Sequence, residues 1–549
     1  MSKIKIFALG GLNENGKNMY VVEVNDDIFV FDAGLKYGID KNLGVDYIIP
    51  SFNYLMENEK RVKGIFLSHG HETHIGAVPD ILTKLPNIPI YATKYTMEIL
   101  KMELDLYKIP ANNLHEIKPH SKIIINNMVL FPISVSHSIP DAVAYVLYTD
   151  DGAIVYTGDY VFDSSMTGNY KTDIGKLAYV GKQGVLCLLS ESLYAEKPGH
   201  TSPNNRITEF IKDVFNKNEN RIIATVLSAH IYRVQELFNE IMKTHRNVII
   251  MGKSLQELII KSIDSGYITF DKTRIKDLYH LDDKGIIVLI SDEKEKPFAN
   301  LERIVKGFDK YIKIKETDTV FITEPPYDGI EKRLAVLMDE VAMLNANCVS
   351  LNKKHLLHHA SREDLMMMLD LMNPKYYFPV KGEYRHQYAN ATVAEEIGMK
   401  KENILLKLNG DVVTFIDGEL TEDLEKVEAD SILIDGNSTD NIGTLVIKDR
   451  EMLGENGIVI VNATLDKKTK TILAGPEIIT KGFVFINDNK ELINETKEVC
   501  LKIINNNIDK AVLKVDYSNI KSDVRDVLSK LYYKRLDSKP VIITVIQEV

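Results

Sequence analysis

The first 60 residues alternate short apolar, β-branched runs with turns rich in Gly, Asn and Asp. This pattern predicts short strands at Ile4–Leu9, Met19–Val24 and Ile28–Phe31. From Val62 the pattern changes to strand, loop and helix. The runs concerned are Val62–Leu67 (strand), Ile75–Leu85 (helix), Ile88–Lys101 (a second such unit), Val129–Val135 and Ala153–Tyr156 (strands). Strands first and then strands alternating with helices predict a mixed sheet sandwiched by helices.

A second α/β region is predicted from about Thr201 to Ser350. Its expected strands are Ile222–Val226, Asn247–Met251, Ile286–Ile290 and Thr319–Ile322. Its expected helices include Asn204–Asn216 and Tyr232–Thr244. Beyond it we expect a helix at Glu363–Met372, a strand at Tyr376–Val380, and polar strands plus a linker at Gly410–Asp449. The last hundred residues, from Glu451, predict a compact α+β domain with helices at Lys490–Asn507 and Asp523–Leu536 and a final strand at Val541–Ile546.

The length and composition add limits to this picture. A chain of 549 residues is too long for one hydrophobic core, so two to four domains are expected. No apolar run is long enough to cross a bilayer, and no signal peptide is evident, which predicts a cytoplasmic protein without a membrane partner. Three cysteines without CxxC spacing indicate buried thiols in a reducing compartment: Cys187, Cys348 and Cys500. The net charge of −11 argues against non-specific coating of nucleic acid, although a local positive channel can still bind it.

A cluster of histidines directly follows the apolar run that ends at Leu67. The segment reads Ser68-His69-Gly70-His71-Glu72-Thr73-His74. At the carboxyl end of a strand, imidazoles at this spacing can converge on one cation. A single histidine is usually structural, whereas three within six residues at a strand-to-helix turn indicate a metal site. Three more candidates follow strand-like runs, although an Asp in such a place is often only a turn residue: Asp32, His137 and Asp159.

These residues, in this order, resemble the metallo-β-lactamase superfamily, whose signature is HxHxDH followed by a lone His, an Asp and a final His. The wider sequence is similar to the ribonuclease J family over essentially its whole length. The segments that carry this similarity are Ala8–Gly11, Gly16–Tyr20, Asp32–Leu35, His137–Asp141, His230–Gln235, Pro379–His386, Gly457–Lys470 and Gly475–Phe483.

The resemblance implies a fold of mixed α/β and α+β class. A metallo-β-lactamase αββα sandwich would carry an inserted β-CASP α/β domain and be followed by a C-terminal α+β domain. The implied boundaries are 1–205 and 351–440 (sandwich and linker), 206–350 (β-CASP domain) and 451–549 (C-terminal domain). RNA would run between the first two domains, and in relatives the C-terminal domain helps oligomerisation. Family members hydrolyse RNA phosphodiesters as 5′-to-3′ exonucleases and endonucleases, usually with two zinc or manganese ions.

The resemblance also assigns roles to individual residues. His69, His71 and His137 would bind the first metal, and Asp159 would bridge to a second metal, for which His74 is a further ligand. Such a pair of cations positions a hydroxide and stabilises developing charge. The implied catalytic residues are Asp159, Asp32 (which would orient a ligand), Glu191 (the β-CASP acidic position) and His359 (a candidate proton donor). The implied RNA- or phosphate-binding residues are His355, Ser138 and Arg233.

Two departures from the family pattern fall on metal ligands. The Asp of HxHxDH is Thr73, and the final His is Lys381. The second site keeps only His74 and Asp159, while the first keeps three imidazoles and Asp159, enough for one tetrahedral zinc. We expect Lys381 to lie beside Asp159, because a buried carboxylate without its metal needs a cation. The competing interpretation is a lysine that points into solvent.

The phosphate-binding segments of the family are altered as well. The glycine-rich TGSQGEP becomes Ser291–Pro297, which has lost its glycines and gained three acidic residues. The motif HxSGHA becomes His355–Ala360, in which Leu357 replaces a phosphate-binding hydroxyl. Lost glycines limit how closely the backbone approaches a phosphate, and acidic side chains repel it.

Changes at several site positions favour a ribonuclease J paralogue with weak or lost hydrolysis. It would bind RNA, hold one zinc, and assemble with itself or with an active paralogue. The alternative is a fully active metal-dependent 5′-to-3′ exo- and endoribonuclease that uses one metal, or holds a second through other groups such as Glu72. A small-ester hydrolase of the same superfamily is disfavoured by the β-CASP and C-terminal similarities.

Overall fold

A computed structural model describes residues 2–38, 44–110, 112–227, 230–291, 298–326, 329–422, 424–435, 444–484, 489–509 and 515–549. The chain forms two compact units, one of residues 1–37 and 46–432 and the other of residues 38–45 and 433–549. None of the helices in the described ranges combines the length and apolar character that a membrane span requires.

The first unit contains two sheets that face each other across one hydrophobic core. The eight-stranded sheet has the order β21-β20-β1-β2-β3-β5-β6-β7. Its strands are β1 (Lys3–Gly10), β2 (Met19–Val24), β3 (Asp27–Phe31), β5 (Val62–Phe66), β6 (Ile90–Thr93), β7 (Leu114–Ile117), β20 (Val413–Ile416) and β21 (Glu419–Leu420). The six-stranded sheet, β19-β12-β11-β10-β9-β8, consists of β8 (Ile123–Ile125), β9 (Met128–Ser134), β10 (Val143–Thr149), β11 (Gly152–Tyr156), β12 (Val185–Glu191) and β19 (Tyr376–Val380).

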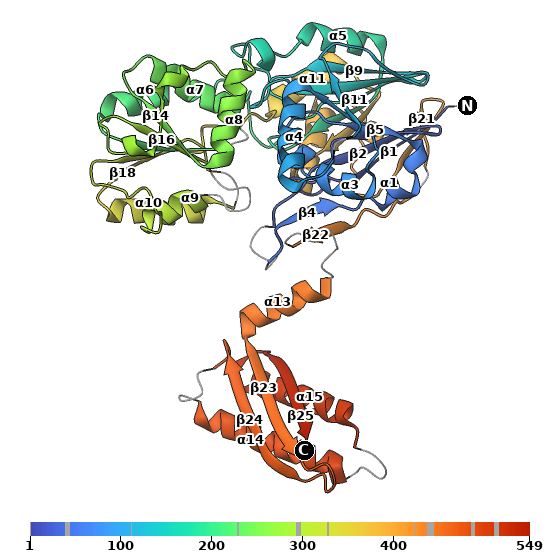
Figure 1. Ribbon diagram of the computed structural model, residues 1–549. Coiled ribbons are helices and arrows are strands. Elements are labelled where there is room, and N and C mark those ends of the chain that lie inside the picture. The colour runs from blue at the N-terminus through green and yellow to red at the C-terminus, as the bar shows by residue number, and fades with distance from the viewer. Residues whose placement is uncertain are drawn as a thin grey trace. The chain divides into compact units, whose positions relative to one another are not determined.

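Helices cover the outer faces of both sheets, as an αββα sandwich requires (Figure 1). Beside the eight-stranded sheet lie α1 (Asn53–Glu57), α2 (Glu72–Ile75), α3 (Val78–Lys84) and α4 (Lys94–Tyr107). Over the six-stranded sheet lie α5 (Ile174–Gln183), α11 (Arg362–Met372) and α12 (Tyr384–Glu396), which share a second apolar core with it. The sandwich fold is therefore confirmed.

An α/β region is inserted between β12 and β19, drawn in green and yellow-green in Figure 1. Its all-parallel sheet has the order β15-β14-β16-β13-β17-β18. The elements are α6 (Thr208–Lys217), β13 (Ile222–Val226), α7 (Ile231–Met242), β14 (Val248–Met251), α8 (Lys253–Asp264), β15 (Ile275–Lys276), β16 (Ile287–Ser291), α9 (Ala299–Val305), β17 (Thr319–Ile322), α10 (Glu331–Met343) and β18 (Asn347–Ser350). Because β12 and β19 are parallel neighbours, with Ser190 opposite Pro379, the chain returns to the sandwich after this region.

The second unit is an α+β domain. The chain enters it within β22 (Ser431–Ile434), and its sheet has the order β24-β23-β25. The elements are α13 (Thr444–Asn456), β23 (Ile458–Leu465), β24 (Ile472–Lys481), α14 (Lys490–Asp509), α15 (Tyr517–Leu536) and β25 (Val541–Glu548). Alternate residues of β23, such as Val459 and Val461, pack with α14 and α15 into one apolar core.

Three predicted segments differ from the structure. The polar stretch Gly410–Asp449 does not end as a linker, because α13 begins at Thr444. The helix predicted from Asp523 begins at Tyr517, where the Asp516 side chain accepts hydrogen bonds from the N–H groups of Ser518 and Asn519. The helix predicted from Asn204 begins at Thr208, after a turn closed by the bond from Arg206 N–H to the Pro203 carbonyl.

Candidate metal centre

Parallel strands of the two sheets end at one edge of the sandwich and carry the candidate residues there. In the eight-stranded sheet, β3 and β5 are parallel, and Asp32 and Ser68 follow their carboxyl ends. In the six-stranded sheet, β11, β12 and β19 are parallel, and Asp159, Glu191 and Lys381 lie at their carboxyl ends. Ligand and catalytic groups collect at this edge of α/β proteins because the loops that follow the strands meet there.

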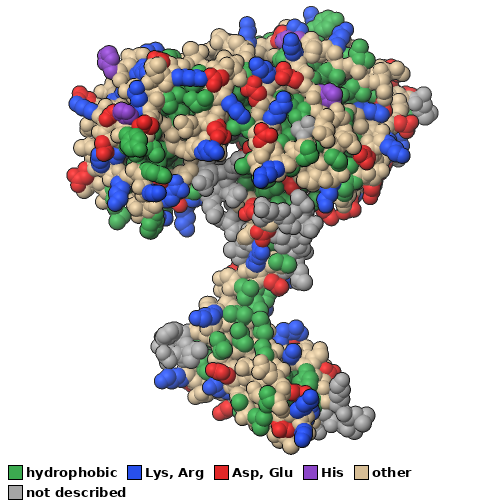
Figure 2. Space-filling view, viewed as in Figure 1, with side chains coloured by type: hydrophobic (Ala, Val, Ile, Leu, Met, Phe, Trp, Pro, Cys, Tyr) green, Lys and Arg blue, Asp and Glu red, His purple; other side chains and the backbone are tan. Residues whose placement is uncertain are grey.

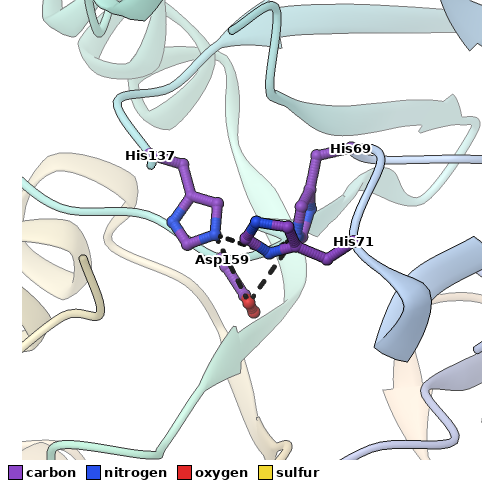
Figure 3. A group of neighbouring side chains, drawn as sticks. All are labelled: His69, His71, His137 and Asp159. Carbon is purple, nitrogen blue, oxygen red and sulfur yellow. Dashed lines mark hydrogen bonds and ion pairs between the residues drawn. The ribbon is translucent and has the colours of Figure 1, made fainter. Parts of the chain in front are cut away.

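Three imidazoles and one carboxylate converge on a common point (Figure 3). His71 Nδ1 lies 3.0 Å from His69 Nε2 and 3.1 Å from His137 Nε2. Asp159 Oδ2 lies 3.7 Å from His69 Nε2 and 3.8 Å from His137 Nε2. Four ligands at about 2.0–2.1 Å from a tetrahedral zinc ion would stand about 3.3 Å apart, so these donors fit one such ion.

Burial prepares these imidazoles to act as ligands. Burial and the neighbouring imidazoles hold the pKa values of His69 and His71 well below the usual range, and burial does the same for His137. A metal binds the neutral imidazole, so no proton has to be displaced from this group.

The second ring nitrogen of each histidine has a polar neighbour. His69 Nδ1 lies 2.9 Å from Ser68 Oγ, and His137 Nδ1 lies 2.7 Å from the carbonyl oxygen of His358. Ser138 Oγ lies 3.4 Å from His71 Nε2. Such contacts orient metal-binding rings and select the nitrogen that faces the ion.

Asp32 is buried behind the centre and contacts His74 rather than the converging donors. Its Oδ2 lies 2.7 Å from His74 Nδ1 and accepts a hydrogen bond from the Tyr156 hydroxyl at 2.6 Å. Ser68 donates to the same carboxylate through its N–H and its hydroxyl, at 2.7 and 2.8 Å. Asp32 therefore holds the ring of His74, and its role in orienting a metal ligand stays a prediction.

Lys381 forms an ion pair with Asp159 inside the protein. Its ammonium contacts Asp159 Oδ2 and lies 3.3 Å from His74 Nε2, and both members of the pair are buried. Burial alone would raise the pKa of Asp159, but Lys381 and His74 hold it well below its usual value. The predicted ion pair is thus present. The ammonium contacts both His74 Nε2 and Asp159 Oδ2, which lie 3.2 Å apart, so these residues do not fit a second cation there.

Glu191 and His359 form a second buried pair beside Asp159. His359 Nδ1 lies 2.8 Å from Glu191 Oε2 and 3.7 Å from Asp159 Oδ2. Burial and the charge of Asp159 raise the pKa of Glu191 well above its usual value. Burial and the ammonium of Lys381 lower the pKa of His359 to about 3. At neutral pH His359 is therefore a neutral imidazole held by a carboxyl group.

The structure does not support the interpretation of Arg233 as a phosphate ligand. The side chain is 1% exposed, and its guanidinium donates to Glu324 at 3.0 Å and to the Thr323 and Asn205 carbonyls at 2.7 and 3.1 Å. An arginine committed in this way joins the α/β insert to the sandwich and has no free face for RNA.

His355 and Glu72 do not belong to the converging donors. His355 lines an open cavity of about 800 Å³, together with Arg206 and Tyr232, and belongs to neither candidate metal group. Glu72 accepts a hydrogen bond from the Tyr37 hydroxyl at 2.6 Å and is also outside both groups. Of the altered phosphate loop, residues 292–297 fall outside the described ranges, and Ser291 ends β16.

Two residues of the site were not singled out from the sequence. Asn18 Nδ2 lies 3.3 Å from His74 Nε2, and the His230 ring lies 6.2 Å from the ring of His71. His230 is held by Glu324 at 3.1 Å. Both lie in segments that carry the family resemblance, Gly16–Tyr20 and His230–Gln235, so the signal was available.

An αββα sandwich with a histidine-rich metal centre and an α/β insert between β12 and β19 defines a metallo-β-lactamase-fold hydrolase of the β-CASP type. Comparison with known families agrees. The matches are the metallo-beta-lactamase superfamily (12–183), the ribonuclease J beta-CASP domain (219–341), the Zn-dependent metallo-hydrolase RNA specificity domain (351–406) and the ribonuclease J C-terminal domain (445–549). The chain belongs to the ribonuclease J family.

Individual relatives span the whole chain. It is 38% identical to ribonuclease J2 of Bacillus subtilis (strain 168), covering 100% of this chain and 99% of that protein. It is 35% identical to proteins called ribonuclease J 2 from Staphylococcus epidermidis (strain RP62A) and Staphylococcus aureus (strain MRSA252), covering 100% of this chain and 98% of each. A crystal structure of a protein of unknown function from Enterococcus faecalis V583 shares the fold, with a TM-score of 0.54 and 17% identity over 76% of this chain and 100% of that one.

Proposed function

We propose that this chain is an RNA-binding member of the ribonuclease J family whose phosphodiester hydrolysis is weak. The observation that carries the proposal is the contact of Lys381 with Asp159 and His74. Two cations normally share the charge that develops when a phosphodiester is cleaved. A single ammonium supplies one positive charge and has no open coordination position for a hydroxide.

The remaining metal position fits one zinc ion, or one manganese ion. His69, His71, His137 and Asp159 would hold it. When bound, such an ion lowers the pKa of a coordinated water and polarises the phosphate. The chain itself keeps the three imidazoles neutral and orients them through Ser68, Ser138 and the carbonyl group of His358.

The state of His359 also supports weak hydrolysis. A proton donor to the leaving oxygen is most effective when its pKa lies near the working pH. The ammonium of Lys381 is among the causes that lower the pKa of His359 to about 3. Burial, and after it the ammonium of Lys381, therefore leave the candidate acid without its extra proton at neutral pH.

RNA binding has a broader basis than hydrolysis. The sandwich segments, 1–205 and 351–440, and the β-CASP region, 206–350, would hold RNA between them. The C-terminal domain, 451–549, would join this chain to a second copy or to an active ribonuclease J paralogue. In that assembly it would act as a partner subunit that binds RNA and leaves most cleavage to the other chain.

The alternative is a fully active 5′-to-3′ exo- and endoribonuclease, and one observation favours it. Asp159, Glu191 and His359 form a second candidate group, whose donor atoms lie within 4.8 Å of one another. A second cation held there would restore a two-metal site at a shifted position. It would then have to displace the hydrogen bond between His359 and Glu191.

Digestion of a 5′-monophosphorylated RNA separates the two functions. We expect the wild-type protein to cleave slower by orders of magnitude than an intact family member, yet to bind the same RNA in a fluorescence anisotropy titration. The His71→Ala variant provides the metal-free baseline. Rapid, processive digestion by the wild-type protein alone would reject the proposal and favour the alternative.

A further inference from the structure

A second open cavity lies in the β-CASP region, at the carboxyl ends of the neighbouring parallel strands β14 and β16. Its volume is about 760 Å³. The lining combines cationic and aromatic side chains from α8, β15, α9 and the loop after α9: Lys253, Lys276, Arg303, Phe308, Lys310 and Tyr311. None of these residues belongs to the candidate metal centre. In parallel α/β sheets, crevices outside the carboxyl ends of strands are the usual place for ligands.

Two aromatic side chains that line this cavity are exposed to solvent. Phe308 is 78% exposed and Tyr311 is 59% exposed. A solvent-exposed Phe next to a second exposed ring is uncommon on a surface that contacts only water. Lys310 lies over the Tyr311 ring, 5.4 Å from its centroid, so a cation and a stacking face are presented together.

The loop that carries these rings is held in place by a buried carboxylate. Asp309 Oδ1 accepts hydrogen bonds from the N–H groups of Tyr311 and Ile312, at 2.8 and 3.0 Å. Arg303 pairs with the same side chain at 3.1 Å. Binding therefore requires little ordering of the loop, and less affinity is lost to conformational entropy.

Among the described residues, the lining of the cavity carries more cations than carboxylates, in a chain whose net charge is −11. Four cations line it, and Asp277 and Asp309 are the described lining carboxylates. Asp309 is neutralised by Arg303, and Asp277 caps a short 3-10 helix (Leu278–His280) by accepting from Tyr279 N–H. In the described ranges, no carboxylate lies within ion-pair distance of Lys276 or Lys310. On the face drawn in Figure 2, the two charge signs are interspersed.

We infer that this cavity binds single-stranded RNA through residues other than those of the candidate metal centre. Bases would stack on Phe308 and Tyr311, while Lys253, Lys276 and Lys310 would contact the phosphates. Aromatic faces interleaved with cations suit a flexible polyanion with exposed bases, whereas a duplex hides its bases from such rings. The inference rests on the proposed RNA-binding function and adds a second contact, which would guide the strand that extends from the cleft.

The test measures binding of the full chain to a 20-nucleotide oligouridylate by fluorescence anisotropy. Phe308→Ala with Tyr311→Ala should weaken binding about 30-fold or more, since two stacked bases are lost and each contributes roughly 1–3 kcal/mol. Lys276→Gln with Lys310→Gln should lower the slope of log Kd against log salt by about 1.4, or about 0.7 per charge. Matched controls are Tyr179→Ala, and Lys217→Gln with Lys284→Gln, which change exposed side chains elsewhere.

A photo-crosslink from 4-thiouridine RNA to the peptide containing Phe308 and Tyr311 gives a readout on the wild-type protein, should a variant fold poorly. Unchanged affinity and slope in both variants, with RNA still bound, would overturn this inference and leave the proposed function standing. No RNA binding by the wild-type protein would overturn both. Uridine monophosphate that competes as strongly as the 20-mer would identify a nucleotide site instead and would also overturn it.

Discussion

Lys381 and Asp159 form a buried ion pair at the position to which the family resemblance assigns a second cation. The charges at this position balance. Losing a divalent ion removes two positive charges, and Thr73 in place of Asp removes one negative charge. The ammonium of Lys381 restores the one positive charge that is then missing. Asp159 consequently keeps a partner, as a buried carboxylate must.

Removing the lysine should destabilise the protein. In metal-free protein, prepared with chelator, Lys381→Met leaves the Asp159 carboxylate buried without its ammonium partner, which costs about 3–5 kcal/mol in comparable pairs. Urea unfolding at pH 7 measures the loss. Lys375→Met is the matched control: its pair with Glu419 is largely exposed, so we expect less than about 1 kcal/mol. Equal losses would show that the buried Asp159 pair contributes no more to stability than an exposed pair.

The pH dependence of this effect has a definite sign. Because the folded pKa of Asp159 lies well below its usual value, the stabilising contribution is complete above about pH 4. It is lost as the pH falls through the lowered folded pKa. The difference between wild type and Lys381→Met should therefore be full at pH 7 and shrink in acid. A difference that grows in acid would contradict this assignment.

Glu191 should show the opposite behaviour, because its folded pKa is raised. Stability is then lost as the pH rises from about 4.3 towards the folded pKa, since the folded state holds a proton that the unfolded state releases. Glu191→Gln keeps an acceptor for the N–H groups of Tyr160 and Ala360 but does not titrate. In the presence of chelator, the free energy of unfolding of the variant should rise relative to that of the wild type between pH 4 and pH 8. Glu196→Gln, at an exposed carboxylate, should not.

Arg233→Met distinguishes a structural arginine from a phosphate ligand. Glu324 loses its buried guanidinium partner and keeps only His230, so we expect unfolding at lower urea, with a loss of about 3–5 kcal/mol. The salt slope of RNA binding should stay unchanged at temperatures where the variant is folded. A slope reduced by about 0.7 without lost stability would return Arg233 to the RNA-binding surface.

Restoring both family residues should raise RNA digestion. Thr73→Asp provides a carboxylate without making room for an ion, and Lys381→His makes room without completing the ligands. Each single change therefore leaves the second metal site incomplete. The gain in RNA digestion of the double variant should exceed the sum of the gains of the two single variants. Additive or absent gains would mean that the altered phosphate segments, Ser291–Pro297 and His355–Ala360, limit the rate.

Strong local patterns allowed much of the fold to be predicted. The bounds expected for Met19–Val24, Ile222–Val226 and Tyr376–Val380 agree with β2, β13 and β19. The stretch that contains α13 was expected to be a linker because its sequence is polar, whereas the cap at Asp516 extended α15 beyond its apolar pattern.

The candidate site was only partly accessible from the sequence. Motif order brought His69, His71, His137 and Asp159 together, and charge balance predicted the partner of Lys381. The contacts of Arg233 could not be predicted from the local sequence, because its partners Thr323 and Glu324 lie about ninety residues away along the chain.

Zinc stoichiometry tests the central claim most directly. Elemental analysis of protein purified without chelator should give at most one tightly bound zinc per wild-type chain, and none in His71→Ala. The Thr73→Asp, Lys381→His double variant should hold two, because it regains the ligands and loses the ammonium. Two tightly bound ions in the wild-type chain would contradict the account and favour the alternative, in which Asp159, Glu191 and His359 hold the second ion.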